Sequence, residues 1–279
     1  MESKMSLKTP SARVLDSYFS RPRYWWISAL AFVLVAAALA WSGAGIDYKG
    51  ITAKGSEVAY GVVYGIFNPD TRVLFDLSTF GVAYLLFETV AIALLGTLFG
   101  GLLAVPFAFL SSDKIVPKPV AFLVRSFVML VRTIPSLVWA LIWIRVTGPG
   151  ALCGVVTQSV CSIGMISKMY VTAIEDVDTR ILESLNAMGC TTFQKIRYGI
   201  LPQLFANMIS TVIYRFDINI KDASTLGIVG AGGIGAVLIQ TIATRRWSMA
   251  GAFLTGMILL MLVIEYISTR LRRRLAQGV

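Results

Sequence analysis

The chain has 279 residues, of which 56% are hydrophobic and only 14% are charged, and its mean hydropathy is +0.74. A soluble globular domain carries roughly 25% charged residues, and several apolar runs here approach the ~20 residues that cross a bilayer. The composition therefore excludes an ordinary soluble protein and predicts an all-α, polytopic membrane protein. The net charge of +10 indicates topology and not nucleic-acid binding, because basic residues gather in the cytoplasmic loops of membrane proteins.

The residue types remove several chemistries from consideration. The sequence contains no histidine, and its three cysteines (Cys153, Cys161 and Cys190) form no CxxC pair. Histidine-based zinc sites, imidazole general bases and Ser-His-Asp triads are therefore excluded, and we expect no metal site.

The N-terminal part predicts a tail, a span and a loop. Residues 1–24 are basic and are expected to form a cytoplasmic tail, and residues 25–42 form a first span with tryptophans at both ends. A cleaved signal peptide is the rival interpretation of this span, because Ala38-Leu-Ala40 resembles a cleavage site. Residues 43–80 are mixed in composition and predict a periplasmic loop with short helices.

Residues 81–270 form the main transmembrane domain. Its spans are predicted at residues 80–110, 120–146, 151–174, 200–220 and 249–268. Glycines such as Gly96 and Gly100 in the first of these allow close helix packing. The glycine-rich segment 221–248 predicts a re-entrant or interfacial piece on the far side of the membrane, and 271–279 is a basic cytoplasmic tail.

The distribution of basic residues supports this layout of about six spans. Segments assigned to the inside hold 14 lysines and arginines, and those assigned to the outside hold 6. An even number of spans places both termini in the cytoplasm, as the positive-inside rule requires.

A polar stretch at 175–199 interrupts the apolar runs. Asp178 is a good helix N-cap, and Gly189 stands where a glycine would end that helix. One apolar stripe follows helical spacing: Ile181, Leu182, Leu185 and Met188. A second short helix is predicted over 193–198, and Pro202 suits the first turn of the next hydrophobic helix. The stretch therefore predicts two amphipathic helices bent at a glycine on the membrane surface, a shape that suits docking against a partner protein.

The chain lacks a convincing nucleotide site of its own. Residues 230–235 match G-x-G-x-x-G, but no βαβ unit surrounds them and no acid follows at the required spacing. Glycines for tight turns and close helix approach are the favoured interpretation, and no Walker A sequence is present. If ATP drives this protein, another chain binds the ATP.

Four ionisable residues within or at the start of spans are candidates for a translocation path: Glu88, Arg132, Arg215 and Asp217. One interpretation is structural, in which Arg132 or Arg215 pairs with Asp217 or Glu88 to hold the bundle. The other is functional, in which an arginine lines an anion path, since guanidinium suits phosphate-like oxyanions.

The polar stretch resembles the EAA loop of ABC-importer permeases. The resemblance rests on Glu183, on Gly189 six positions later, and on Leu201-Pro202. In that family the loop docks into a cytoplasmic ATPase, which implies coupling roles for Glu183, Ser184, Ala187, Gly189, Leu201 and Pro202. Ser184 and Leu185 replace the two alanines of the motif, and Gly199 stands where an apolar residue is common.

Five further stretches, in order along the chain, resemble the phosphonate, phosphite and hypophosphite branch of this family: 88–97, 132–141, 196–203, 214–219 and 227–235. The resemblance implies a type I ABC-importer permease that catalyses no bond chemistry. It also implies a second permease subunit, two ATPase subunits that bind ATP and Mg²⁺ in place of any cofactor in this chain, and a periplasmic solute-binding protein. Which phosphorus oxyanion is carried stays open, as does whether the second permease is identical or a paralogue.

Two other classes remain as alternatives. An intramembrane enzyme would need a nucleophile–base pair or a metal cluster at one depth, and the scattered carboxylates and absent histidine argue against it. A membrane scaffold or sensor would need a substantial soluble domain, and no segment outside the spans is long enough.

Overall fold

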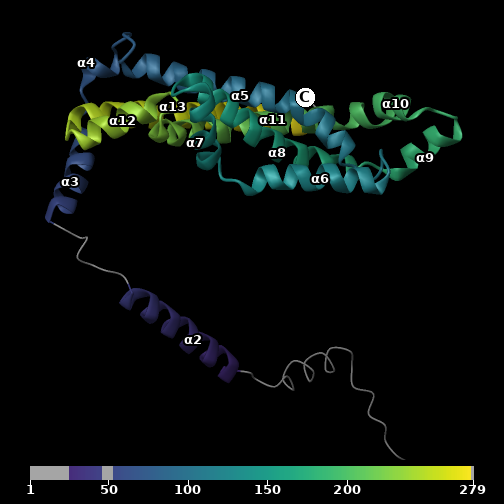
Figure 1. The fold of residues 1–279 in the computed structure, drawn as a ribbon, viewed down its shortest axis with the longest axis horizontal. Helices are drawn as coiled ribbons and strands as arrows, with labels where there is room; N and C mark the ends of the chain where they lie inside the picture. The colour runs from purple at the N-terminus through teal and green to yellow at the C-terminus, as the bar shows by residue number, and fades with distance from the viewer. Residues whose placement is uncertain (1–24, 46–52, 278–279) are drawn as a thin grey trace, which may run out of the picture. The chain divides into compact units, whose positions relative to one another are not determined.

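The computed structural model describes residues 25–45 and 53–277, which form helices joined by short turns (Figure 1). The chain divides into two units, residues 1–56 and 57–279. In the first unit, α2 (Trp25–Ala44) is a 20-residue apolar helix with no buried side chain, which agrees with the predicted first span. The tail predicted at 1–24 lies outside the described residues.

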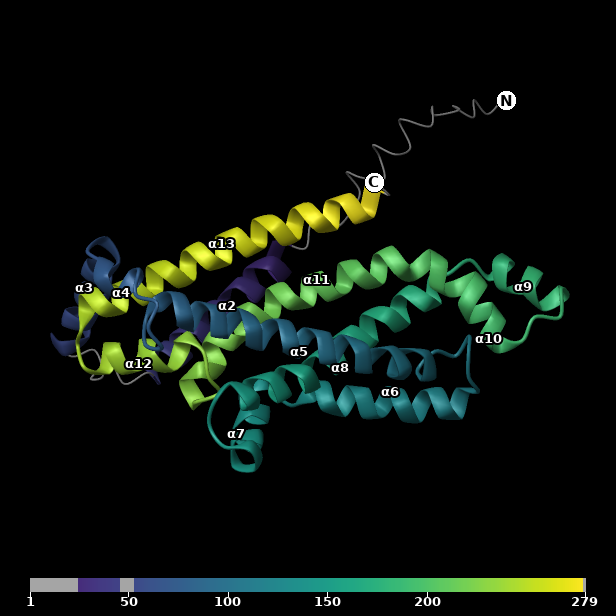
Figure 2. The same cartoon turned by 90° about the horizontal axis from the view of Figure 1, so that it is seen from above.

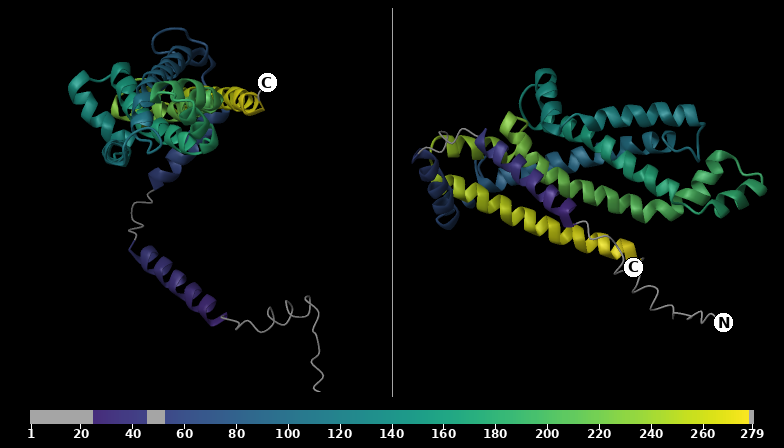
Figure 3. Two further views of the ribbon diagram at one scale, coloured as in Figure 1. Left: turned by 90° about the vertical axis from the view of Figure 1, so that its right-hand side faces the viewer. Right: turned by 90° about the horizontal axis from the view of Figure 1, so that it is seen from below.

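The second unit is a bundle of long helices. Its main members are α5 (Val82–Leu110), α8 (Ala151–Glu175), α11 (Leu201–Leu226) and α13 (Trp247–Gln277), and Figures 2 and 3 show them running along the length of the unit. The closest pair is α5 and α8. A Cβ atom built on Gly96 would collide with Gln158, and one on Gly100 with Ser162, so the predicted glycine packing is confirmed.

The span predicted over 120–146 is not one helix. It consists of α6 (Lys118–Thr133) and α7 (Ser136–Thr147), whose axes differ by 88° (Figure 2). Pro135 causes the break, because it has no N–H to donate and forces Ile134 into an extended conformation (φ −83°, ψ 122°). The carbonyl of Val131, which residue 135 would have bonded, instead accepts the indole N–H of Trp139 at 3.2 Å. The predicted span is therefore a bent pair of helices, and the break at Pro135 was not predicted.

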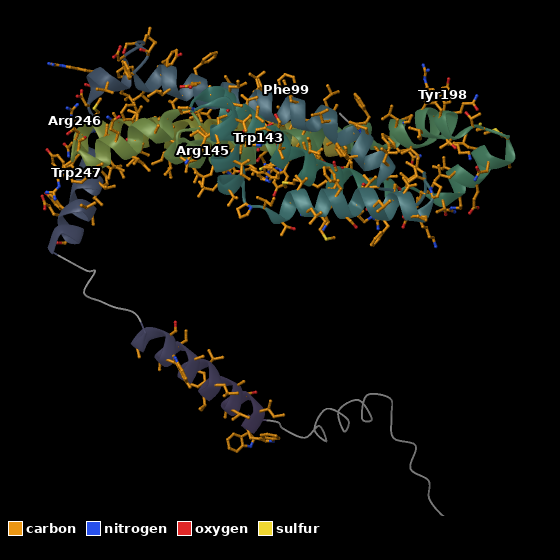
Figure 4. The ribbon with its side chains drawn as sticks, viewed as in Figure 1. Phe99, Trp143, Arg145, Tyr198, Arg246 and Trp247 are labelled. Atoms are coloured by element: carbon orange, nitrogen blue, oxygen red, sulfur yellow. The ribbon has the colours of Figure 1, made fainter. Side chains whose placement is uncertain are left out.

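Short helices lie at the end of the bundle opposite α9. They are α3 (Ala53–Phe67), α4 (Thr71–Leu74) and α12 (Ile234–Ala243). Within the second unit, Gly61 and Gly65 of α3 leave room for the first turns of α13, at Trp247 and Gly251 (Trp247 is labelled in Figure 4). The short helices predicted in 43–80 are thus present.

Glycines 230–233 turn the chain from α11 into α12. Gly230, Gly232 and Gly233 all have positive φ angles (86°, 82° and 75°), which L-residues adopt only with strain. A 3-10 turn (Gly227–Val229) precedes them, and the segment 192–229 and α12 differ in direction by 50°. The interpretation of these glycines as turn formers is confirmed. The segment predicted from residue 221 begins within α11, which continues to Leu226.

Among the described residues, four helices are long and apolar enough to cross a membrane: α2, α5, α8 and α13. The two bent pairs, α6 with α7 and the 192–229 segment with α12, raise the number to six if each pair is one span. This range agrees with the predicted architecture of about six transmembrane helices.

Candidate functional site

An arm formed by residues 178–200 projects from one end of the bundle, where Figure 2 shows α9 and α10 beyond the ends of α6 and α8. Its first helix, α9 (Thr179–Ala187), begins at Asp178, whose carboxylate accepts the backbone N–H of Arg180 at 2.9 Å. The Arg180 side chain also donates to this carboxylate, and these two bonds lower the pKa of Asp178. The predicted N-cap is confirmed.

The helix ends in a complete Schellman motif. The N–H of Gly189 donates to the carbonyl of Asn186 at 2.9 Å, and the N–H of Cys190 donates to the carbonyl of Leu185 at 3.0 Å. This geometry needs the φ of +75° at Gly189, which glycine adopts without strain. The predicted glycine stop is confirmed.

The second helix of the arm does not stop before Pro202. α10 (Thr192–Gln194) starts in a capping box between Thr191 and Gln194, passes through a π turn (Lys195–Ile200) and continues into α11. The prediction of a separate helix over 193–198 was therefore wrong. The wider π turn accommodates Pro202, which has no N–H and whose ring would clash with the carbonyl of Tyr198, four residues earlier, in a regular helix.

Two of the three positions that depart from the EAA-loop pattern, Leu185 and Gly199, contact each other. A Cβ atom at Gly199 would lie 2.6 Å from Cδ1 of Leu185, so the glycine makes room for that leucine. A large residue at 185 and a small one at 199 thus complement each other across the arm. This packing joins α9 to the π turn that precedes α11, with leucine at a position where the motif has alanine.

The residues predicted to contact an ATPase lie exposed along the arm and at the start of α11: Glu183, Ser184, Ala187, Gly189, Leu201 and Pro202. Beside them are apolar side chains with little cover. Met188, Phe193 and Tyr198 are 69%, 68% and 66% exposed, and Tyr198 is labelled in Figure 4. Of the predicted apolar stripe, Leu182 and Leu185 are half-buried, whereas Ile181 and Met188 are exposed. The arm therefore exposes both polar and apolar groups.

Two basic side chains tie the base of the arm to the turn after α5. The ammonium of Lys114 donates to the carbonyls of Glu175 (2.6 Å) and Val177 (2.9 Å). Arg125 donates to the carbonyl of Ser111 (2.9 Å) and to the carboxylate of Glu175 (3.0 Å). Beyond the charges themselves, no sequence signal indicated this role, because the partners at the base of the arm are at least 50 residues away along the chain.

A cavity of about 220 Å³ lies at the break between α6 and α7 and carries two arginines. Its walls are Val131, Arg132, Ile134, Pro135, Ser136, Cys161, Arg215 and Asp222. Arg215 is only 6% exposed. Its guanidinium donates to Ser162 Oγ at 3.0 Å and contacts Met165 Sδ at 3.2 Å, and it lies 3.8 Å from the carboxylate of Asp222.

The structure brings together only two of the four predicted path residues. Arg132 and Arg215 share the cavity, whereas Asp217 lies 3.3 Å from Lys221, which in turn reaches Glu265 of α13 at 3.5 Å. Glu88 is half-buried on α5 and forms no ion pair with any described residue. The predicted pairing of an arginine with Asp217 or Glu88 was therefore wrong, and Asp222, which the sequence analysis did not single out, is the acid that Arg215 faces.

A buried polar network holds Arg215 from behind. The amide of Asn219 donates to Thr97 Oγ1 (2.8 Å) and to Ser162 Oγ (2.9 Å), and the amide of Gln158 donates to the carbonyl of Asn219 (2.7 Å). These bonds join α5, α8 and α11. Sequence reasoning missed the network, although uncharged polar residues inside predicted spans were its visible signal.

The bundle and its arm define the class of protein. Solved structures with this fold include the inward-facing MetNI methionine ABC transporter (22% identity, TM-score 0.59, 68% of this chain and 94% of that chain). A second is a bacterial ABC transporter involved in import of the acidic polysaccharide alginate (16% identity, TM-score 0.58, 89% of this chain and 99% of that one). The fold is that of the type I ABC-importer permeases, as predicted.

A family model narrows the assignment. The model of the binding-protein-dependent transport system inner membrane component matches residues 96–279, and the chain belongs to this family. It is 32% identical to the putative phosphite transport system permease protein HtxC of Stutzerimonas stutzeri, over 86% of this chain and 83% of that one. It is 30% identical to the phosphate-import permease protein PhnE of Mycolicibacterium smegmatis, over 67% of this chain, and the match spans 36% of the mycobacterial protein.

Proposed function

We propose that this chain is the permease subunit of an ATP-driven importer of phosphonates or related reduced-phosphorus oxyanions such as phosphite and hypophosphite. The observation that carries the proposal is the cavity shared by Arg132 and Arg215. The names of the relatives HtxC and PhnE, which describe phosphite and phosphate transport, support the same class of solute.

The chemistry of the cavity suits a small tetrahedral anion. Guanidinium groups present planar pairs of N–H donors that match phosphorus-bound oxygens. Ser162 fixes the guanidinium of Arg215 through Nε, while a terminal nitrogen, Nη2, faces Asp222 at 3.8 Å, which is long for a hydrogen-bonded ion pair. An oxyanion can therefore bind Arg215 without first breaking a close ion pair.

Energy for transport would come from another chain. We propose that two ATPase subunits dock on the exposed groups of the arm and bind ATP and Mg²⁺, that a second permease completes the pathway, and that a periplasmic binding protein delivers the solute. The arm would then lie on the cytoplasmic side of the inner membrane together with both termini. Closure of the ATPases would move the arm, and the tied bundle would alternate between inward- and outward-facing states.

The test of this function is uptake by the complete transporter with Arg215→Ala, using phosphite, hypophosphite, methylphosphonate and phosphate as separate solutes. We expect at least a tenfold loss of uptake, equivalent to about 1.4 kcal/mol, while the complex still assembles. Arg270→Ala, which removes an exposed arginine near the end of α13, is the matched control. Unchanged uptake in Arg215→Ala would make this arginine structural and would remove the main support for an anion path here.

A further inference from the structure

A second cavity lies next to the arginine cavity and shares Arg132 with it. It measures about 370 Å³, and its walls are Arg132, Met165, Lys168, Met169, Thr172, Ala173, Asp176 and Asn207. Met165 separates the two spaces, since it lines the second cavity while its sulfur contacts the guanidinium of Arg215, which lines the first. We infer that the second cavity is a further binding station for the transported oxyanion, between the arginine cavity and the arm. This inference rests on the proposed function.

The two cavities follow one another along α8. Cys161 lines the first, Met165 stands at the divide, and Met169 and Thr172 line the second. These positions are three to four residues apart and therefore lie on one face of the helix. From Cys161 to Thr172 the helix rises about 16 Å, so an anion bound in the second cavity would be roughly two to three helical turns closer to the arm.

The charges of the second cavity suit an anion that must also leave. Arg132 and Lys168 supply two cations, and neither forms an ion pair with a described residue. Thr172 and Asn207 supply neutral hydrogen-bonding groups. Asp176, at the arm end of α8, supplies one carboxylate that repels an anion. Conduction requires binding that is strong enough for entry and weak enough for release, and this balance is expected of a station near the exit.

Arg132 is placed to serve both stations. It lies one residue before the last residue of α6, beside the break at Pro135, and its side chain is exposed. The stem of the side chain packs on Gly164, where a Cβ atom would lie 2.5 Å from Cγ of Arg132. The glycine therefore makes room for the stem on α8, and the side chain of Arg132 lines both cavities.

Two cysteines, one native and one introduced, can report on the two stations separately. Cys161 reports on the first cavity in a chain carrying Cys190→Ser, and Met169→Cys reports on the second in a chain that also carries Cys161→Ser. The complete transporter is placed in phosphatidylcholine vesicles, and the rates of reaction with a negatively and a positively charged methanethiosulfonate are compared with and without inorganic phosphite.

We expect phosphite to slow the reaction at both cysteines. Lys168→Gln should remove the protection of Met169→Cys but not that of Cys161. It should also lower the preference of Met169→Cys for the negative reagent by about fivefold, the effect of removing one nearby charge at a partly screened site. Lys168→Arg should restore both properties, and Lys195→Gln, which changes a lysine of the arm outside both cavities, should alter neither.

The outcomes separate this inference from the proposed function. The second station would be overturned, and the importer left intact, by one combination of results. In that case the vesicles take up phosphite, but phosphite does not protect Met169→Cys and Lys168→Gln does not change the preference of this cysteine for the negative reagent. Protection of both cysteines without uptake would support the station and count against the importer. Protection of Met169→Cys by added phosphatidylglycerol, with none by phosphite, would make the cavity a lipid headgroup site and overturn its role as a solute station.

Discussion

The arm and the arginine cavity are built in opposite ways. The hydrogen bonds that cap and end the first helix of the arm join residues two to five positions apart, as in the cap at Asp178 and the stop at Gly189. The bonds around Arg215 and Asn219 join residues at least 50 positions apart and from three helices, α5, α8 and α11. The arm therefore has a shape encoded in its own sequence, whereas the cavity exists only when the bundle is assembled.

This difference suits the two tasks proposed for them. An exposed arm that transmits force needs a defined local shape before any partner binds, and capping supplies it. A binding site for an anion inside a membrane needs charges that are held and partly neutralised by surrounding helices. Substitutions in the two regions should therefore fail in different ways, the arm in coupling and the cavity in assembly or solute binding.

The largest effect is expected for Asn219→Leu in the polar network. This change removes the amide that donates to Thr97 and Ser162. Ser162, which accepts a hydrogen bond from Arg215, then loses one of the bonds that position it. We expect a loss of about 1–2 kcal/mol in the free energy of unfolding, together with most of the uptake. Thermal unfolding of the purified transporter and uptake by vesicles measure these two losses. Asn207→Leu, on the same helix but outside the network, should leave the stability nearly unchanged, and equal destabilisation by both would contradict the special role of Asn219.

The next largest effect is expected for Gly189→Val in the arm. Valine at a φ of +75° costs about 1–2 kcal/mol of local strain, so the end of α9 should distort while the bundle stays folded. We expect transport to fall sharply while the complex assembles and ATP hydrolysis loses its dependence on transport. Gly189→Asn is the matched control, because asparagine tolerates this backbone conformation. Normal coupling between ATP hydrolysis and transport in Gly189→Val would contradict the role assigned to this glycine.

The same contrast explains how much the sequence could predict. The cap at Asp178, the stop at Gly189 and the glycine turn at 230–233 follow from local rules and were predicted. The partner of Arg215 was not, because its choice of Asp222 over Asp217 depends on which face of α11 packs against α8. The break at Pro135 had a local signal that was overlooked in favour of a long hydrophobic run. The hydrogen bonds between Lys114 and the base of the arm had no local signal in the sequence.

A smaller effect is expected for Gly199→Ala, which tests whether two of the three departures from the EAA-loop pattern, Leu185 and Gly199, compensate each other. The new methyl group would lie 2.6 Å from Leu185 Cδ1, so the leucine side chain must move away from its position in the arm. Adding Leu185→Ala should relieve the clash and recover transport. A double-mutant cycle on the unfolding free energy should give a coupling of at least about 0.5 kcal/mol. Additive effects of the two substitutions would show that the contact does not define the arm.

The smallest effect is expected for Trp139→Phe at the break between α6 and α7. Phenylalanine keeps most of the ring but cannot donate to the carbonyl of Val131, and a lost hydrogen bond of this kind costs about 1 kcal/mol. Because the break positions Arg132, we expect weaker apparent affinity for the solute with maximal uptake nearly unchanged. Concentration dependence of uptake separates these two quantities. Trp143→Phe, four residues further along α7 and without a hydrogen bond from its indole to any described residue, is the matched control. If both variants behave alike, the indole bond at residue 139 does not set the position of Arg132, and the proline alone determines the break.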